Sequence, residues 1–344
     1  MYQEVRELSE DLWKNKLASW GHPEYRAKQI LEWAWQKQVK SFEEMTNLPI
    51  QLRKQLHEGF FFNKIEIEDR QISFDGSVKY SLKLIDNQII EGVLIPHFDR
   101  VTACVSSQVG CALACKFCAT GYLGFKRNLH GYEIYDQVAL LQQQSVVSFG
   151  KQLSNIVFMG MGETLLNYRN ILQSIDYLTS GRGMNISAKR ITVSSAGIAK
   201  MIRKLGDDNV RFEFALSLHA ANDEKRSQIM PINEHNSLKM IKEALQYFYA
   251  KTKNQITLEY IIFSDFNDSL KDAEEVYRFS RGLPCKINII EYNPIPESGF
   301  QNASLERVEI FKKYLTTKGL IVNIRRSRGK DIDAACGQLA LRKK

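Results

Sequence analysis

Hydrophobic and polar residues follow two different periods in the first hundred positions. Residues 1–60 carry apolar side chains at helical spacing, which predicts four short helices, at 8–19, 25–38, 41–45 and 49–59. Beyond residue 62 the pattern becomes that of strands. Apolar side chains fall on every second position over 77–84, and a second, mostly apolar run covers 89–95, with Asp86 and Asn87 as the turn between them. The pattern predicts a small helical domain followed by an antiparallel β extension.

From residue 97 to the end, strand-like and helix-like segments alternate. The expected strands cover 101–106, 155–159, 190–194, 211–218, 255–263, 286–292 and 321–325. The expected helices cover 132–147, 168–178, 198–205, 223–229, 237–251, 270–281 and 304–317. Such alternation is typical of an α/β protein with a parallel sheet, which forms a full barrel, a partial barrel or an open sheet. We therefore divide the chain into a helical accessory domain (1–60), a β extension (61–96) and a catalytic domain (97–344).

Polar and glycine-rich segments follow several of the expected strands. They are residues 160–163 (Gly-Met-Gly-Glu), 194–197, 217–219 and 293–294. In barrels and open α/β sheets alike, reactive groups gather at the carboxyl ends of parallel strands. The sequence therefore predicts one functional rim.

Composition and charge are those of a globular protein. The chain has 344 residues, 44% of them hydrophobic, and neither a membrane-length apolar run nor the layout of a signal peptide, so a cytoplasmic location is expected. Its formal net charge of +8 suits a polyanionic partner. On charge alone, a nucleic-acid-binding face and an ordinary solvated basic face both remain open.

The number and spacing of the cysteines point to a metal or cluster site. Only six cysteines are present, too few for a disulfide scaffold, and Cys104, Cys111, Cys115 and Cys118 lie close together in the sequence. Cys111, Cys115 and Cys118 suit an iron-sulfur cluster with one open iron. The alternative is a zinc site with Cys104 as a fourth ligand, although Cys104 falls inside an expected strand rather than in the loop.

The spacing Cys-x3-Cys-x-Phe-Cys, followed after the next strand by Gly160–Glu163, resembles the signature of radical S-adenosylmethionine (SAM) enzymes. The resemblance implies a partial (βα)6 barrel in which Cys111, Cys115 and Cys118 hold a 4Fe-4S cluster whose open iron binds SAM. It also implies further SAM-contacting positions: Phe117, Gly162, Glu163, Ser194, Ser217, Leu218, His219 and Asn293. Of these, His219 taken alone also suits a structural histidine.

Four further segments resemble one family within that superfamily: residues 105–111, 124–129, 217–223 and 335–339. The family is the bacterial dual-specificity adenine C2 methyltransferases of 23S ribosomal RNA and tRNA, with the C8 methyltransferase as a close relative. The likeness covers nearly the whole chain, including the helical first domain, for which an RNA-binding role is then expected. One departure is Thr164, where the family usually has proline, and a looser loop is expected there.

Carbon 2 of adenine is electron-poor and does not attack the methyl group of SAM, so the resemblance implies a radical route with two SAM molecules per turnover. Cys336 takes a methyl group, which is then activated and joined to the ring. Cys104 resolves the adduct through a transient disulfide, and Glu91 acts as the base. Read from the residues alone, Cys336 could be a small buried side chain, but its polar, glycine-flanked loop favours a reactive thiol. Glu91 could be an exposed residue of an edge strand. Cys285 matches no reactive position and is expected to be structural.

Basic clusters at 126–127, 189–190, 325–330 and 342–344 are expected to meet RNA phosphates at the same rim. The target adenine must be unstacked, which favours a loop or a remodelled hairpin. The family implies an electron donor such as flavodoxin, and we expect a monomer without membrane contact. Two rival functions remain open: C8 methylation of the same rRNA adenine, and a non-catalytic RNA-binding protein organised by zinc.

Overall fold

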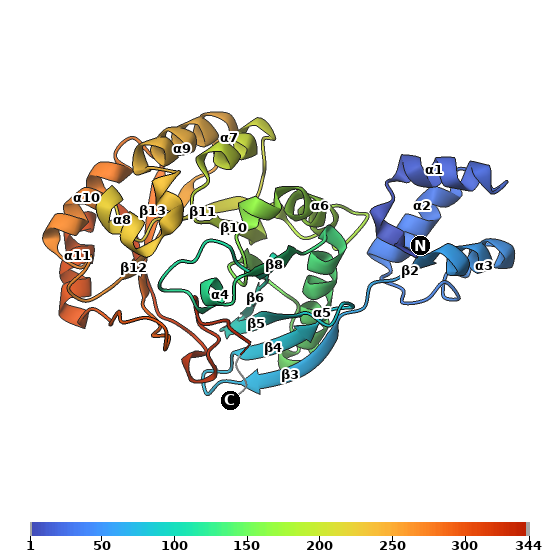
Figure 1. Ribbon diagram of the computed structural model, residues 1–344, viewed down its shortest axis with the longest axis horizontal. Coiled ribbons are helices and arrows are strands. Elements are labelled where there is room, and N and C mark those ends of the chain that lie inside the picture. Colours follow the sequence, from blue (N-terminus) through green and yellow to red (C-terminus); the bar gives the residue numbers. More distant parts are fainter. Residues whose placement is uncertain (1, 342–344) are drawn as a thin grey trace.

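The computed structural model describes residues 2–341, and its first part is a helical domain (Figure 1). The elements of this domain are β1 (Gln3–Glu4), a 3-10 turn (Val5–Glu7), α1 (Glu10–Ser19), α2 (Arg26–Leu31), a π-helical turn (Glu32–Gln36), α3 (Ile50–Gly59) and β2 (Phe60–Phe61). The helix expected at 41–45 is wrong: this segment forms turns and bends, although Phe42 and Met45 are buried. Burial of two apolar side chains fixes the segment without a helical turn.

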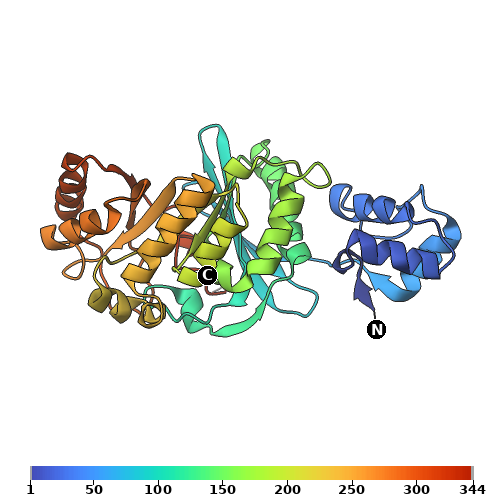
Figure 2. The ribbon, with the colours of Figure 1, turned by 90° about the horizontal axis from the view of Figure 1, so that it is seen from above.

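A buried ionic network fastens this domain to the rest of the molecule. The guanidinium of Arg6 donates to both carboxylate oxygens of Asp136 in α5 (Gly131–Phe149), at 2.6 and 2.8 Å, and to Glu4 at 2.8 Å. Beside it, the ring of Trp35 stacks on Tyr177 with centroids 3.7 Å apart. Figure 2 shows the helical domain projecting to one side, so these contacts are concentrated at a narrow junction.

A single ten-stranded sheet forms the body of the molecule, in the order β14-β13-β12-β11-β10-β9-β6-β5-β4-β3. The bounds are β3 (Glu66–Ile72), β4 (Val78–Lys83), β5 (Ile89–His97), β6 (Arg100–Cys104), β9 (Asn155–Phe158), β10 (Ile191–Ser195), β11 (Glu213–Ser217), β12 (Ile256–Ile262), β13 (Cys285–Glu291) and β14 (Ile321–Arg325). Strands β6 and β9 to β14 are parallel, and β3 to β6 are joined by antiparallel pairing. All seven strands expected in the catalytic domain are present.

The helices that follow the parallel strands cover the outside of this curved sheet (Figure 1). They are α5 (Gly131–Phe149), α6 (Tyr168–Thr179), α7 (Ala199–Asp207), α9 (Leu238–Thr252), α10 (Leu270–Ser280) and α11 (Leu305–Thr317). The short helix α8 (Asp223–Ile229), between β11 and α9, lies instead at the carboxyl ends of the strands, where its Arg226 donates to the carbonyls of Ala196 and Ser217. Shorter 3-10 turns lie at Thr164–Asn167, Ala188–Arg190, Pro231–Glu234 and Lys330–Ile332. Six βα units are thus followed by a last strand, β14, and because β14 does not pair with β3 the barrel is partial. The expected fold class is confirmed.

The β extension continues the barrel wall. Strand β5 lies between β4 and β6, so it is an inner strand, and Glu91 is fully buried in it. The reading of Glu91 as an exposed edge residue is therefore wrong. The sheet also runs without interruption across residues 96 and 97, and our division of the chain at that point stays a prediction. Across residues 2–341 we find no helix with the length and apolar character that a membrane span requires.

Candidate active site

The cysteine loop leaves β6 and is framed by a small hairpin. Strands β7 (Gln108–Gly110) and β8 (Phe125–Asn128) pair antiparallel, and the short helix α4 (Ala119–Tyr122) lies between them. Gly110 has a φ of +73°, and a Cβ there would stand 1.8 Å from the carbonyl oxygen of Gly124. Only glycine therefore allows the hairpin to close just before Cys111.

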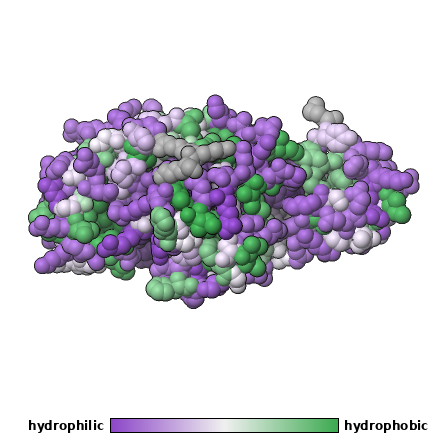
Figure 3. Space-filling model, turned by 90° about the horizontal axis from the view of Figure 1, so that it is seen from below, coloured by the Kyte–Doolittle hydropathy of each residue, from purple (hydrophilic) through white to green (hydrophobic). Residues whose placement is uncertain are grey.

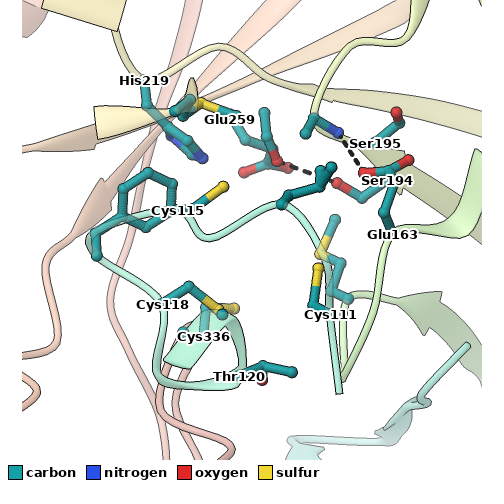
Figure 4. Close-up of a pocket in the computed structure, with 18 of the residues that line it drawn as sticks. Cys111, Cys115, Cys118, Thr120, Glu163, Ser194, Ser195, His219, Glu259 and Cys336 are labelled. Atoms are coloured by element: carbon teal, nitrogen blue, oxygen red, sulfur yellow. Dashed lines mark hydrogen bonds between the residues drawn. The ribbon is translucent and has the colours of Figure 1, made fainter. Parts of the chain in front are cut away.

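Cys111, Cys115 and Cys118 line one cavity of about 890 Å³ on the inner face of the sheet. Figure 4 shows their side chains on the loop, with His219, Glu259 and Glu163 across the cavity. In the described chain, no three acidic, histidine or cysteine side chains converge as tightly as one metal ion requires.

Burial is the main influence on the pKa values of all three loop thiols. Burial raises the pKa of Cys111 to about 11, and burial with the neighbouring thiols raises the pKa of Cys115 well above its usual value. Burial raises the pKa of Cys118 as well. Such thiols stay protonated on their own and give up their protons when a metal binds. The donor set therefore fits an iron-sulfur cluster.

Glu163 lies on the loop after β9, opposite the cysteines. Its carboxylate is buried and accepts hydrogen bonds from the backbone N–H groups of Leu165, at 3.0 Å, and Ala196, at 2.8 Å. Burial raises its pKa, and those N–H groups oppose the rise. Gly162 has a φ of +99°, and a Cβ there would come within 2.5 Å of Gln108. A tightly held acid beside a glycine suits recognition of an amino group.

Thr164 follows the acid where the resemblance expects proline. It is buried, and its hydroxyl donates to the carbonyl oxygen of Ser194 in β10. The looser loop expected here is therefore not found, because the threonine supplies its own tether to the next strand.

The other positions matched to SAM contacts differ in placement. Phe117, Ser194, Ser217 and His219 line the cavity with the cysteines. The ring of His219 packs edge-on against Phe117, with centroids 4.8 Å apart, and its Nδ1 accepts a hydrogen bond from the N–H of Ile261. Burial lowers the pKa of His219 to about 3, so the ring is neutral and carries its hydrogen on Nε2.

Leu218 and Asn293 are buried but do not line this cavity. Leu218 contributes its backbone, since its carbonyl accepts from Arg226 at 3.1 Å. Asn293 donates from Nδ2 to the carbonyl oxygen of Cys336 at 3.2 Å, and its buried Oδ1 has no hydrogen-bond partner among residues 2–341. That unmatched acceptor is compatible with a bound donor group next to Cys336.

Cys336 lies against the cysteine loop, at the other end of the sequence. The backbone N–H of Ala119 donates to the carbonyl oxygen of Gly337 at 2.7 Å, and a Cβ on Gly337 would stand 3.1 Å from the carbonyl oxygen of Phe117. Cys336 lines the first cavity, and it is exposed rather than a small core side chain. Although the residue reaches solvent, protein atoms around the thiol desolvate it and raise its pKa, and Arg325 opposes the rise.

Cys104 lines a second cavity, of about 640 Å³, that also contains Cys336 and Arg325. It does not line the cavity of the three loop cysteines, which counts against a zinc site that uses Cys104 as a fourth ligand. Burial raises the pKa of Cys104 to about 12. Cys104 and Cys336 are free thiols, as is the buried Cys285, which lines neither cavity.

Glu91 points to the same face of the sheet as Cys104. Val93 pairs with Lys79 on one side and with Cys104 on the other, and Glu91 is two residues before Val93. Since side chains alternate along a strand, all of them face inward, with Glu91 one diagonal step from Cys104. Burial raises the pKa of Glu91, and the ammonium of Lys79 opposes that rise. The N–H of Leu341 donates to its Oε2 at 3.1 Å, so the end of the described chain covers this acid.

Sequence reasoning missed two polar residues of the first cavity and its wall. Glu259 is buried in β12, lines the cavity and accepts from Asn288 at 2.9 Å and from Arg325 at 3.3 Å. A carboxylate inside the apolar run 256–262 is the signal that could have found it. Arg226 is fully buried and donates to the carbonyls of Ala196 and Ser217, at the ends of β10 and β11. No spacing pattern marks that role.

The basic clusters that we expected at one rim do not lie together in the structure. Lys189 and Arg190 precede β10, so they lie at the amino end of the strands, away from the cavities, and that expectation is wrong. Nitrogens of the Arg127 guanidinium lie 2.7 Å from a carboxylate oxygen of Asp86 and 2.7 Å from one of Glu133. This side chain is therefore already paired with acids of the protein. The cluster at 325–330 borders the second cavity, and the cluster at 342–344 lies outside the described residues.

The partial barrel, the cysteine loop at the carboxyl end of its first parallel strand and the acid after the second define a radical SAM enzyme. The sequence model of the radical SAM superfamily matches residues 105–279. Membership in that superfamily implies a 4Fe-4S cluster and SAM as cofactors. A second model, described as the ribosomal RNA large subunit methyltransferase N-terminal domain, matches residues 5–61.

Relatives narrow the class further. The chain is 55% identical to a protein of Cytophaga hutchinsonii described as a probable dual-specificity RNA methyltransferase RlmN, over 98% of this chain and 93% of the relative. It is 47% identical to a protein of Christiangramia forsetii with the same description, over 98% and 96%. The crystal structure of a radical SAM methyltransferase from Sphaerobacter thermophilus superposes with a TM-score of 0.90 at 38% identity, covering 98% and 99% of the two chains. The chain belongs to the RlmN family of radical SAM RNA methyltransferases.

Proposed function

We propose that this enzyme methylates carbon 2 of an adenine in the peptidyl-transferase region of 23S rRNA, and an adenine in the anticodon arm of certain tRNAs, through a methylated Cys336. The observation that carries the proposal is the position of Cys336. It lines the cavity of the three cluster cysteines and also the cavity that contains Cys104. One thiol can therefore be reached from the cofactor side and from a second, resolving thiol.

In this proposal Cys111, Cys115 and Cys118 hold the cluster, and Glu163 receives the ammonium group of SAM. When bound, the cluster and SAM would supply a carbon radical that removes a hydrogen atom from a methyl group. The chain's task is to place that methyl group on Cys336, close to the cysteine loop. The contact between Ala119 and Gly337, together with the hydrogen bond from Asn293 to Cys336, supports such positioning.

Cys336 first takes a methyl group from one SAM, and its sulfur loses the thiol proton. The cluster and a second SAM, held by the loop cysteines and Glu163, would supply the hydrogen-atom abstraction at this methyl group. The resulting methylene carbon on Cys336 would then form a bond to carbon 2 of adenine. One electron then leaves the adduct toward the electron-transfer partner, and Glu91 takes the proton from carbon 2. The burial of Glu91, which raises its pKa, makes it a stronger base than an exposed carboxylate.

Cys104 then releases the product. Its sulfur, after losing a proton, attacks the sulfur of Cys336, an S–S bond forms and the C–S bond breaks. The electron pair of that bond stays on the carbon, which takes up a proton and becomes the new methyl group. Two electrons from a thiol reductant must afterwards reduce the disulfide. Arg325, the charged neighbour of both thiols, favours their thiolate forms.

An electron donor such as flavodoxin fits the single-electron steps, and we propose that the enzyme works as a monomer. The decisive experiment is anaerobic reaction of the reconstituted enzyme with unmodified RNA, followed by mass spectrometry and NMR of the digested nucleosides. We expect 2-methyladenosine. A product methylated only at carbon 8 would overturn the choice of carbon. Purified protein that contains zinc, no iron or sulfide and no SAM cleavage under reduction would instead favour the non-catalytic alternative.

A further inference from the structure

Arg226 is a buried cation beside the cofactor cavity that the proposed chemistry does not use. Charged side chains normally stay on the surface, and the face seen in Figure 3 is largely hydrophilic. Arg226, in contrast, is 0% exposed. It belongs to the short helix α8, which ends at Ile229, and the carbonyl of Ile229 accepts from the N–H of Lys116 in the cysteine loop at 3.0 Å. One helix therefore joins this cation to the loop that carries the cluster ligands.

The guanidinium of Arg226 has neutral hydrogen-bond acceptors. It donates to the carbonyl oxygens of Ala196 at 2.5 Å, Ser217 at 3.1 Å and Leu218 at 3.1 Å, and to Oδ1 of Asn233 at 2.8 Å. Among residues 2–341 no carboxylate forms an ion pair with it. A cation that is taken out of water without a counter-charge is costly, so a fold that keeps one needs negative charge nearby.

The cysteine loop supplies that negative charge when it holds a cluster. Burial lowers the pKa of Arg226 to about 10, and the thiolate of Cys115, followed by Asp223, opposes the fall. Cys115 and Arg226 are thus close enough to interact electrostatically. Cysteine binds iron as a thiolate, so an occupied cluster site brings negative charge to this wall of the cavity.

We propose that Arg226 raises the reduction potential of the cluster, because its buried charge favours the reduced state over the oxidised state. Reduction moves one electron from the electron donor to the cluster and no proton, so the cluster becomes more negative by one charge. A cation held in a medium of low dielectric constant stabilises that added charge more strongly than an exposed cation does. Arg226 is thus a positioning residue. The inference rests on the cluster that membership in the superfamily implies, and it is independent of which RNA atom is methylated.

The test measures the reduction potential of the reconstituted enzyme without RNA. The enzyme is titrated with titanium(III) citrate, and the reduced cluster is followed by electron paramagnetic resonance. Arg226→Gln keeps hydrogen-bond donors and removes the charge. We expect it to lower the equilibrium constant for reduction about tenfold, which for one electron is a shift of about 59 mV to lower potential. Arg226→Lys keeps the charge and should keep the wild-type potential.

A second variant leaves Arg226 in place. Asn233 donates from Nδ2 to Oδ1 of Asp223 at 2.9 Å, and the same oxygen accepts from the N–H of Leu238 at 2.8 Å. The exchange variant, Asp223→Asn with Asn233→Asp, moves the carboxylate next to the guanidinium while the net charge and the side-chain sizes stay the same. The potential should fall here too, because the carboxylate would offset the charge of Arg226.

Arg203→Gln is the matched control, because it removes an exposed arginine from the outer helix α7 and should leave the potential unchanged. Unchanged potentials in Arg226→Gln and in the exchange variant would overturn the inference. An equal shift in Arg226→Lys would overturn it as well, because the charge would then not be the cause. If Arg226→Gln fails to retain iron, the exchange variant decides the outcome. Since the titration contains no RNA, a failure of the proposed methylation leaves these potentials interpretable.

Discussion

The ammonium of Lys79 lies 3.4 Å from a carboxylate oxygen of Glu91, and both side chains are buried inside the barrel wall. A buried charge is costly unless it is paired, so each of these residues offsets part of the desolvation cost of the other. The two strands that carry them belong to the β extension. This extension therefore supplies the proposed base together with its charge partner.

Lys79→Met should change the pH dependence of product release. Burial raises the pKa of Glu91 and Lys79 lowers it, so removing the ammonium raises the pKa further. A base must be deprotonated, and the acidic limb of the pH-rate profile for methylated RNA should move to higher pH, with the rate recovering above the new pKa. Lys313→Met, which removes an exposed lysine of α11, is the control. An acidic limb that stays in place in the Lys79 variant would remove Glu91 from the role of base.

Cys104→Ala should stop the reaction after the RNA is joined to Cys336. We expect a covalent protein–RNA band on a denaturing gel and at least a hundredfold loss of released product, because no thiol remains to attack Cys336. Cys336→Ala should give neither band nor product while retaining the cluster. Cys285→Ala removes a buried cysteine that lines neither cavity and should behave as wild type. Normal turnover by the Cys104 variant would contradict its resolving role.

Asp75→Ala should loosen the segment that carries Cys336. Asp75 accepts from the N–H of Gly329 at 2.9 Å, and next to it Asp331 accepts from the hydroxyl of Ser73 at 2.6 Å. Removing the carboxylate frees the start of the loop, while the reactive thiol of Cys336 itself is retained. We expect faster hydrogen exchange over residues 329–339 and about a tenfold slower methylation of RNA, since misplacement of a reacting group by about 1 Å can cost as much as a hundredfold. Asp99→Ala, at an exposed turn, is the control, and unchanged exchange would show that Asp75 does not hold the loop.

Arg6→Met should release the helical domain. It leaves the carboxylates of Glu4 and Asp136 buried without their cation, and breaking a buried charge pair costs roughly 3–5 kcal/mol. Limited proteolysis should cut near residues 62–65, between β2 and β3, much faster than in wild type. Arg53→Met, in helix α3, removes a guanidinium that donates to the carbonyl of Glu43 and forms no ion pair with residues 2–341. It tests whether any arginine of this domain has the same effect. Equal cleavage rates in the two variants would refute a fastening role for Arg6.

The sequence pattern predicted the helices and strands more accurately than the contacts between residues of different strands. The spacing of the three loop cysteines and the alternation of strands and helices depend on neighbouring residues, and both are present in the structure. The pairing of Lys79 with Glu91 depends on strand order, which periodicity does not contain, so Glu91 was assigned to an edge. Glu259 and Arg226 act through contacts with other strands and were missed. Lys189 and Arg190 were expected at the carboxyl ends of the strands because their charge suited RNA. Their position just before a strand, which puts them at its amino end, was not considered.

The segment after β14 lies beside β3 and β4 and spans the open side of the partial barrel (Figure 1). The same segment carries Cys336, so the thiol that the proposed reaction joins to RNA belongs to a segment that borders both cavities. While such a bond existed, the RNA would be tethered to the wall of the cofactor cavity. Breaking the bond between sulfur and carbon would then release the RNA and this wall of the cavity in a single step.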